Sequence, residues 1–95
     1  MNILKYQIRR TSQFKKDYKR SIKRGLDIGK LDAAIEILAK NGSLPPEYND
    51  HPLVGDMKGL RECHIEPDWL LVYGIDHGIL VLVLTSTGTH SDLFE

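Results

Sequence analysis

The chain has 95 residues, too few for two independent hydrophobic cores, and the sequence therefore predicts one domain over residues 1–95. No apolar run approaches the ~20 residues that span a bilayer, and the first residues lack the charged-then-apolar order of a signal peptide. The one cysteine, Cys63, cannot form an internal disulfide, so we expect a reducing, cytoplasmic location and no membrane association.

The net charge of zero hides an uneven distribution of charge. Residues 1–40 hold eleven Lys and Arg against four Asp and Glu, a difference of +7, whereas residues 41–95 hold two against nine, a difference of −7. Screening reaches only about 8 Å in cellular salt, so a folded surface can keep separate basic and acidic regions. A basic face suits RNA or an acidic protein partner, although lysines that merely keep a helix face in water would give the same count.

The first elements predicted along the chain are a strand and a helix. Apolar and polar residues alternate over residues 4–9, which is the period of a half-buried strand. Thr11 or Ser12 can cap the helix that follows, and Gly25 supplies the left-handed residue that ends it. The apolar stripe of this helix is Phe14, Tyr18 and Ile22, and the basic residues off the stripe are Lys15, Lys16, Lys19, Arg20 and Lys23.

A second helix is expected from about Lys30 to Lys40, with Gly42 after its end, and the two helices should form a hairpin. Its apolar stripe is Leu31, Ala34, Ile35 and Leu38. The stretch Ser43–Asp56 has three prolines and no sustained period, which predicts a long loop of the kind that usually serves a function or is disordered.

Three strands are predicted next, over residues 60–66, 69–76 and 79–86, with connections short enough for hairpins. Residues 79–84 are apolar at every position, so the last strand should be central and buried on both faces. Residues 89–94 are compatible with a short terminal helix. The order β-α-α-β-β-β predicts an α+β fold, with an antiparallel sheet and a helical hairpin packed on one side of it.

Histidine can exchange protons near neutral pH, and the chain has four of them. His77 lies at a hairpin tip and is interpreted as a turn residue. Strand alternation places His64 on the face opposite Cys63, and a meander brings the end of one strand near the start of the next. We therefore expect His51, His64, Asp68 and His90 to meet on one concave face.

Metal binding and nucleophilic attack by a cysteine are two alternatives to acid–base catalysis. Three histidines with Asp68 or Cys63 could bind Zn²⁺, but no pair has a spacing typical of metal sites, and we expect no metal and no cofactor. A nucleophilic Cys63 is disfavoured because the neighbouring Glu62 opposes thiolate formation.

RNA cleavage fits the remaining set of residues. The 2′-hydroxyl of RNA can attack the adjacent phosphorus, so the protein need supply only a base, an acid and positive charge near the phosphate. Two histidines and a carboxylate provide the acid and the base. Trp69 and Phe94 are candidate surfaces for stacking on a base, although Trp69 would serve equally well in the core.

Several motifs together resemble the YafQ branch of the RelE/ParE toxin superfamily, over essentially the whole chain. They are Asp50-His51-Pro52-Leu53, Lys58-Gly59-Leu60-Arg61, His64-Ile65-Glu66-Pro67-Asp68-Trp69, Tyr73, Thr87-Gly88-Thr89-His90 and Leu93-Phe94. The resemblance implies a small microbial RNase-like fold and a toxin of a bacterial toxin–antitoxin pair. Such a toxin cleaves mRNA on the ribosome, is silenced by a cognate antitoxin and reaches DNA only through the antitoxin complex.

Carried over by motif, the functional positions are His51, His64, Asp68, His90 and Phe94, with Trp69 in support. The expected roles are His51 or Asp68 near the attacking 2′-hydroxyl, His90 near the leaving oxygen, and His64 orienting or charging the phosphate.

The chain departs from the family pattern at Ser86, where the family has an arginine before Thr-Gly-Thr-His. Arginine offers phosphate a permanent charge and a planar fork, and serine offers neither. The chain is then either an inactivated form of a toxin, which its otherwise intact motifs favour, or a divergent member in which Arg61 or a protonated histidine supplies the charge.

Two other functions remain open at this point. A ParE-type gyrase inhibitor would share the fold but would have no need of the histidine and aspartate set. A toxin relic that only binds its antitoxin would be consistent with Ser86.

Overall fold

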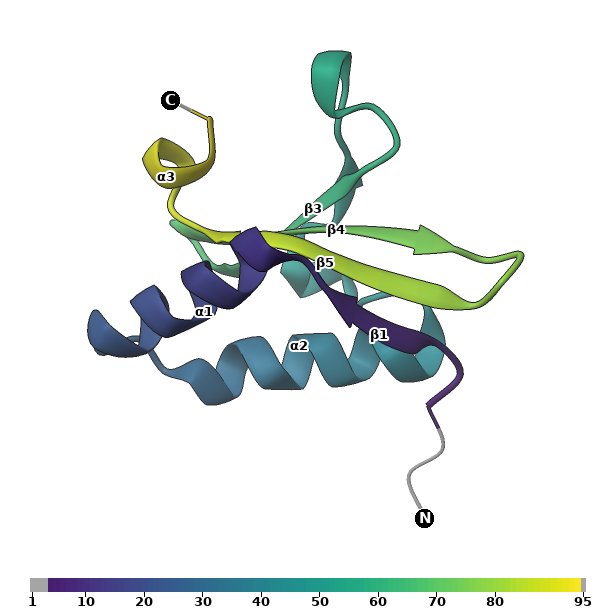
Figure 1. Ribbon diagram of the computed structural model, residues 1–95, viewed down its shortest axis with the longest axis horizontal. Helices are drawn as coiled ribbons and strands as arrows, with labels where there is room; N and C mark the ends of the chain where they lie inside the picture. The colour runs from purple at the N-terminus through teal and green to yellow at the C-terminus, as the bar shows by residue number, and fades with distance from the viewer. Residues whose placement is uncertain (1–3, 95) are drawn as a thin grey trace.

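The computed structural model describes residues 4–94, which form an α+β fold with two helices on one side of a five-stranded sheet (Figure 1). In chain order the elements are β1 (Gln7–Arg10), α1 (Ser12–Lys23), α2 (Ile28–Asn41), the 3-10 helix η1 (Pro46–Tyr48), β2 (His51–Pro52), the 3-10 helix η2 (Gly55–Met57), β3 (Arg61–Glu66), β4 (Trp69–Asp76), β5 (Val81–Gly88) and α3 (His90–Phe94). Within this described part, no helix has the length and apolar character that a membrane span requires.

The sheet has the strand order β1-β5-β4-β3-β2. The hairpin connections β3–β4 and β4–β5 are antiparallel as predicted, but β1 runs parallel to β5, so the sheet is mixed rather than wholly antiparallel. Alternation along β1 indicates a strand and says nothing about its partner. That partner is the last strand of the chain, more than 70 residues away, for example Ile8 opposite Leu82.

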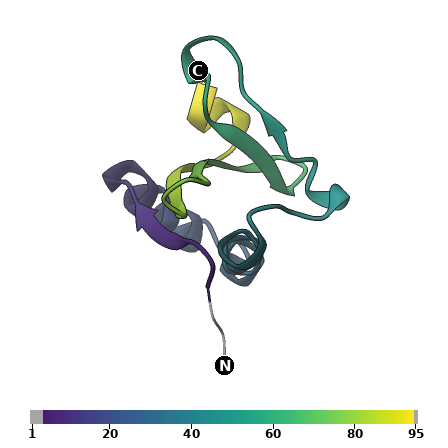
Figure 2. The same cartoon turned by 90° about the vertical axis from the view of Figure 1, so that its right-hand side faces the viewer.

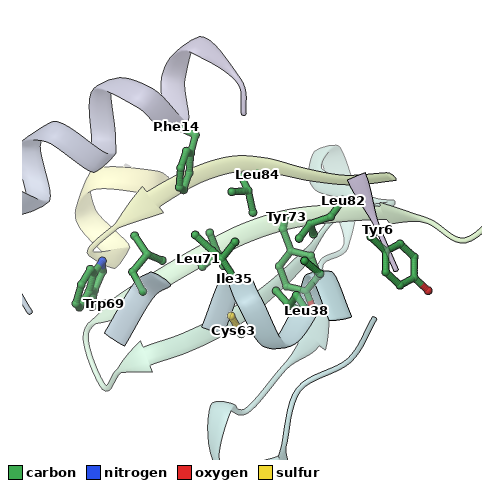
Figure 3. Close-up of a cluster of buried hydrophobic side chains, with 12 residues drawn as sticks. Tyr6, Phe14, Ile35, Leu38, Cys63, Trp69, Leu71, Tyr73, Leu82 and Leu84 are labelled. Carbon is green, nitrogen blue, oxygen red and sulfur yellow. The ribbon is translucent and has the colours of Figure 1, made fainter. Parts of the chain in front are cut away.

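The two faces of the sheet are covered differently. Helices α1 and α2 cover one face, whereas α3 and the segment around η2 rise from the other face, here called the open face because neither of the two long helices lies on it (Figures 1 and 2). The core lies between the helices and the sheet. Phe14 from α1 and Ile35 from α2 meet Leu71 and Leu84 of the strands there (Figure 3), and Phe14, Leu71 and Leu84 are fully buried.

Helix α1 begins and ends as predicted, but a different face of it is buried. Thr11 caps its start by accepting a 3.0 Å hydrogen bond from the Phe14 N–H. Ile22, expected in the apolar stripe, is 52% exposed, and Asp17 and Ser21 are buried instead. The reason is tertiary, because the Asp17 carboxylate accepts a hydrogen bond from the Thr87 N–H of β5, a partner that the helix pattern does not contain.

Strand β5 begins two residues later than predicted. Ile79 is 70% exposed and Leu80 has a φ of 57°, because both belong to the turn between β4 and β5. Asp76 organises this turn by accepting hydrogen bonds from the N–H groups of Gly78 and Ile79. The strand is internal to the sheet as expected, but Val83 is only half-buried, so burial on both faces holds for part of its length.

Candidate active site

The open face of the sheet carries a row of residues from four strands. His51 is opposite Glu62, Glu62 is opposite Val72, and Val72 is opposite Ser86. Residues opposite one another across antiparallel strands point to the same face, and so does His64, two residues after Glu62 on β3. His51, Glu62, His64 and Ser86 therefore share the face above which α3 stands.

The carboxylate of Glu62 lies between the two histidines. Its Oε1 is 3.6 Å from His51 Nε2 and 3.7 Å from His64 Nε2, and its side chain is only 5% exposed. The two imidazole rings lie 6.2 Å apart, centroid to centroid. Because the carboxylate is nearly out of solvent, water screens its interactions with neighbouring groups only weakly.

Backbone carbonyls orient both rings. His51 Nδ1 lies 2.8 Å from the carbonyl oxygen of Asn49, and His64 Nδ1 lies 3.3 Å from that of Pro67. A carbonyl only accepts hydrogen bonds, so each Nδ1 carries the proton. In the neutral ring Nε2 is then unprotonated and lies on the side of the Glu62 carboxylate, and an unprotonated nitrogen is what a general base requires.

A partly buried hydrogen-bond network anchors the segment that carries His51. Asp50 accepts a 2.6 Å hydrogen bond from the Tyr73 hydroxyl and a 3.1 Å hydrogen bond from Arg61 Nε. Burial and the bond to Asp50 raise the pKa of Tyr73 well above its usual range, so this hydroxyl stays a donor. The network fixes the backbone one residue before His51.

Arg61 is therefore not placed as the cation of the phosphate site. Its guanidinium pairs with Asp50, and its place on β3, one residue before Glu62, turns its side chain toward the opposite face of the sheet. Trp69, too, has another role than the one considered for it at the RNA. Its ring is 3% exposed and its Nε1–H donates a 3.0 Å hydrogen bond to Thr87 Oγ1, so the ring belongs to the core and offers no face for base stacking.

His90 and Phe94 lie together on α3. Both side chains are exposed, and their ring centroids are 5.0 Å apart. Figures 1 and 2 show α3 on the same side of the sheet as the segment leading from β2 to β3, so His90 and the His51–Glu62–His64 cluster lie on one side.

Asp68 lies near the end of β5, and its part in the predicted site stays a prediction. It is exposed at the β3–β4 turn and lines a hollow with Arg24, Gly88 and Thr89. The carboxylate beside the two histidines is that of Glu62. Alternation already placed Glu62 and His64 on one face of a strand, but the sequence does not show that β2 would bring His51 to the same carboxylate.

Neither a thiolate nor a cluster of metal ligands is available at this face. Burial, and then the charges of Asp50 and Glu62, raise the pKa of Cys63 to about 12, so the thiol stays protonated and unreactive. Among residues 4–94, no three His, Cys, Asp or Glu side chains gather in a way that could hold a metal ion.

The family model described as "Bacterial toxin of type II toxin-antitoxin system, YafQ" matches residues 6–95. The chain belongs to this family. It is 40% identical, over 93 residues, to the mRNA interferase toxin YafQ of Escherichia coli K12, a match that covers 97% of this chain and 99% of the relative.

Solved structures agree with this assignment. The E. coli DinJ-YafQ toxin–antitoxin complex matches with a TM-score of 0.87 at 40% identity, covering 97% of this chain and 100% of the matched chain. A metal-bound toxin from Helicobacter pylori matches with a TM-score of 0.85 at 42% identity, with the same coverage of both chains. The family and the fold that the motifs indicated are thereby confirmed.

Proposed function

We propose that this chain is an mRNA interferase that cuts message on the ribosome, with its own side chains as acid and base. The observation that carries the proposal is the pair of imidazoles, His51 and His64, that flank the buried carboxylate of Glu62 on the open face of the sheet. The family membership and the name of the E. coli relative support the same activity.

The reaction begins at the 2′-hydroxyl. His51 Nε2 takes the hydroxyl proton while the 2′-oxygen forms a bond to phosphorus, and Glu62 stabilises the imidazolium that results. The unprotonated Nε2 that the Asn49 carbonyl imposes favours His51 over Asp68 as this base. His64, on the other side of the carboxylate, donates a hydrogen bond to a phosphate oxygen when protonated, a role that its contact with Glu62 supports.

The reaction ends at the 5′-oxygen. The bond from phosphorus to this oxygen breaks, and His90 gives it a proton, which leaves a 2′,3′-cyclic phosphate on one fragment and a 5′-hydroxyl on the other. Phe94 stacks on a base next to the cut, a role that its exposed ring beside His90 supports.

The antitoxin and the ribosome require surfaces outside this site, and we assign them to the basic helix side. A groove between β1, α1 and α2 has apolar walls from Ile8, Phe14 and Ile35, with Lys15 and Lys19 at its margin. Its further lining residues are Leu4, Arg10, Tyr18, Asp32 and Glu36. This combination suits an amphipathic acidic segment of a cognate antitoxin, the class of partner present in the E. coli complex.

The test compares alanine variants of the four histidines on a translated message in a ribosome-containing extract. His51→Ala, His64→Ala and His90→Ala should each lower cleavage by about 10²–10⁴-fold, the range for a lost proton-transfer group. His77→Ala is the matched control, because His77 sits in the β4–β5 turn and bonds the Tyr6 hydroxyl instead. The series is run in this chain and in its Ser86→Arg variant. Equal effects of all four changes would overturn the proposal.

Ser86 supports one other candidate function, a relic that binds antitoxin without cutting RNA. Its side chain lies on the site face at the position where the family has arginine, and serine brings no charge there. Tight antitoxin binding with no cleavage in either the chain as written or Ser86→Arg would favour the relic.

A further inference from the structure

The helix that carries His90 and Phe94 is not held by a hydrophobic core. None of the five residues of α3 is buried. A helix this short is unstable in water on its own, so contacts outside it must fix its direction. Those contacts come from the second half of α1 and from Arg24, which follows it, more than 60 residues earlier in the chain.

Asp92 joins the start of α3 to Arg24, the residue that follows the last turn of α1. Asp92 Oδ2 accepts the Thr89 N–H at 2.9 Å, and the Asp92 N–H donates to Thr89 Oγ1 at 3.1 Å, which is a reciprocal cap. The Arg24 guanidinium reaches both carboxylate oxygens, at 2.7 and 3.3 Å. This fork holds the pKa of Asp92 well below its usual range, so the pair stays charged at neutral pH.

Arg20 and Asp17 fix the backbone just before α3. Asp17 is 1% exposed, and its Oδ2 accepts the Thr87 N–H at 3.1 Å. Arg20 pairs with Asp17 Oδ1 at 3.1 Å and donates to the Thr87 carbonyl at 3.2 Å. Both backbone groups of Thr87 are therefore bound by side chains of α1.

Gly88 lets these two sets of contacts come together. A Cβ on Gly88 would lie 2.9 Å from both Arg20 Nη2 and Asp92 Oδ2, closer than real Cβ contacts allow. The end of β5 is thus packed between a side chain of α1 and a side chain of α3, with no room for another.

We propose that Asp17, Arg20, Arg24 and Asp92, here called the α1–α3 clamp, are positioning residues for His90. The clamp sets the direction of α3, and α3 sets where the His90 imidazole stands above the site face. The assignment rests on the proposed function, because it takes His90 as the acid of the reaction. A displacement of about 1 Å in a catalytic group can cost about 10²-fold in rate, so the clamp has a kinetic consequence.

The first experiment measures the order of α3 by NMR in the full chain. Arg24→Gln removes the fork without touching α3, and Arg9→Gln, on the exposed edge strand β1, is the charge-matched control. Backbone order parameters at Asp92 and Leu93 should fall from about 0.85 to below about 0.6 in Arg24→Gln and stay unchanged in Arg9→Gln. Unchanged order at both residues in Arg24→Gln would overturn the clamp.

The second experiment links the clamp to His90 through cleavage by the Ser86→Arg chain. Arg24→Gln should lower kcat at least about tenfold with little change in KM, and Arg24→Lys should restore part of the loss. In a background that carries both His90→Ala and Phe94→Ala, Arg24→Gln should have no further effect, because both functional groups of α3 are then absent. A full Arg24→Gln effect in that background would contradict the link.

The two proposals can fail separately. If His90→Ala leaves cleavage unchanged, the proposed function of His90 fails, and the order parameters of α3 still decide whether the clamp exists.

Discussion

His51 and His64 face one carboxylate from two different strands. Their Nε2 atoms lie 3.6 and 3.7 Å from Glu62 Oε1, while each Nδ1 is turned to a backbone carbonyl. This relationship gives two imidazoles a shared counter-charge on an open face, which lets one ring accept a proton while the carboxylate stabilises the cation.

Glu62→Gln tests that shared charge. The amide keeps the size of the side chain but removes its charge, so a developing imidazolium loses its stabilisation, and cleavage should fall at least about tenfold, about 1.4 kcal/mol of barrier. Glu66→Gln is the control, since Glu66 pairs with Lys30 at the surface. Equal rates for Glu62→Gln and its parent would show that the carboxylate is not used.

Replacing Trp69 should mainly lower the stability of the fold, whereas replacing Phe94 should mainly lower cleavage. Trp69→Ala removes a buried ring and should cost about 3–5 kcal/mol of unfolding free energy. Phe94→Ala changes an exposed ring, should cost less than about 1 kcal/mol, and should still reduce cleavage. Urea unfolding read against cleavage decides this, and a Trp69→Ala chain as stable as its parent would contradict the core assignment.

Cys63 should be inert in the folded chain. With its pKa raised to about 12 by burial and by the nearby carboxylates, alkylation at mildly alkaline pH should be at least about a hundredfold slower than in urea. Mass spectrometry after timed labelling measures both rates. Similar rates in the two conditions would mean that the thiol is accessible.

Much of the fold follows from local pattern. Thr11 at the start of α1 and the left-handed Gly25 and Gly42 after the helices are where local chemistry predicts them. Contacts between distant segments were not predictable. The parallel pairing of β1 with β5 and the burial of Asp17 both depend on residues some 70 positions away.

In the candidate site, too, local pattern is predictable from the sequence and contacts between distant segments are not. Alternation predicts His64 on the face opposite Cys63, where the structure has it, and the motif makes His51 a candidate. Arg61 could not be assigned from sequence, because its pairing with Asp50 depends on the path of the loop before β2. The sequence shows Glu62 only as a charge beside Cys63, because the pairing of β2 with β3 is what brings His51 to it.

The basic face of α1 should bind a polyanionic or acidic partner. Charge reversal at Lys16, Lys19 and Lys23, all exposed, should weaken association with antitoxin or ribosome and reduce its dependence on salt. Arg20 is left out because it is bound to Asp17 and Thr87. Titrations at several salt concentrations measure both affinities, and unchanged affinities and slopes would show that the lysines only keep the helix in water.

The most direct test of the central claim is cleavage of a translated message by three chains: the protein as written, Ser86→Arg, and Ser86→Arg with His90→Ala. Position 86 lies on the site face two strands from Glu62, about 10 Å at the usual strand spacing, which is within reach of an arginine and a phosphate together. The transition state concentrates negative charge at phosphorus, so Ser86→Arg should raise the rate at least about tenfold, about 1.4 kcal/mol of barrier. Adding His90→Ala should remove that gain, because charge cannot replace the proton donor. The account is contradicted if the chain as written already cleaves as fast as Ser86→Arg, or if the His90→Ala chain keeps the gain.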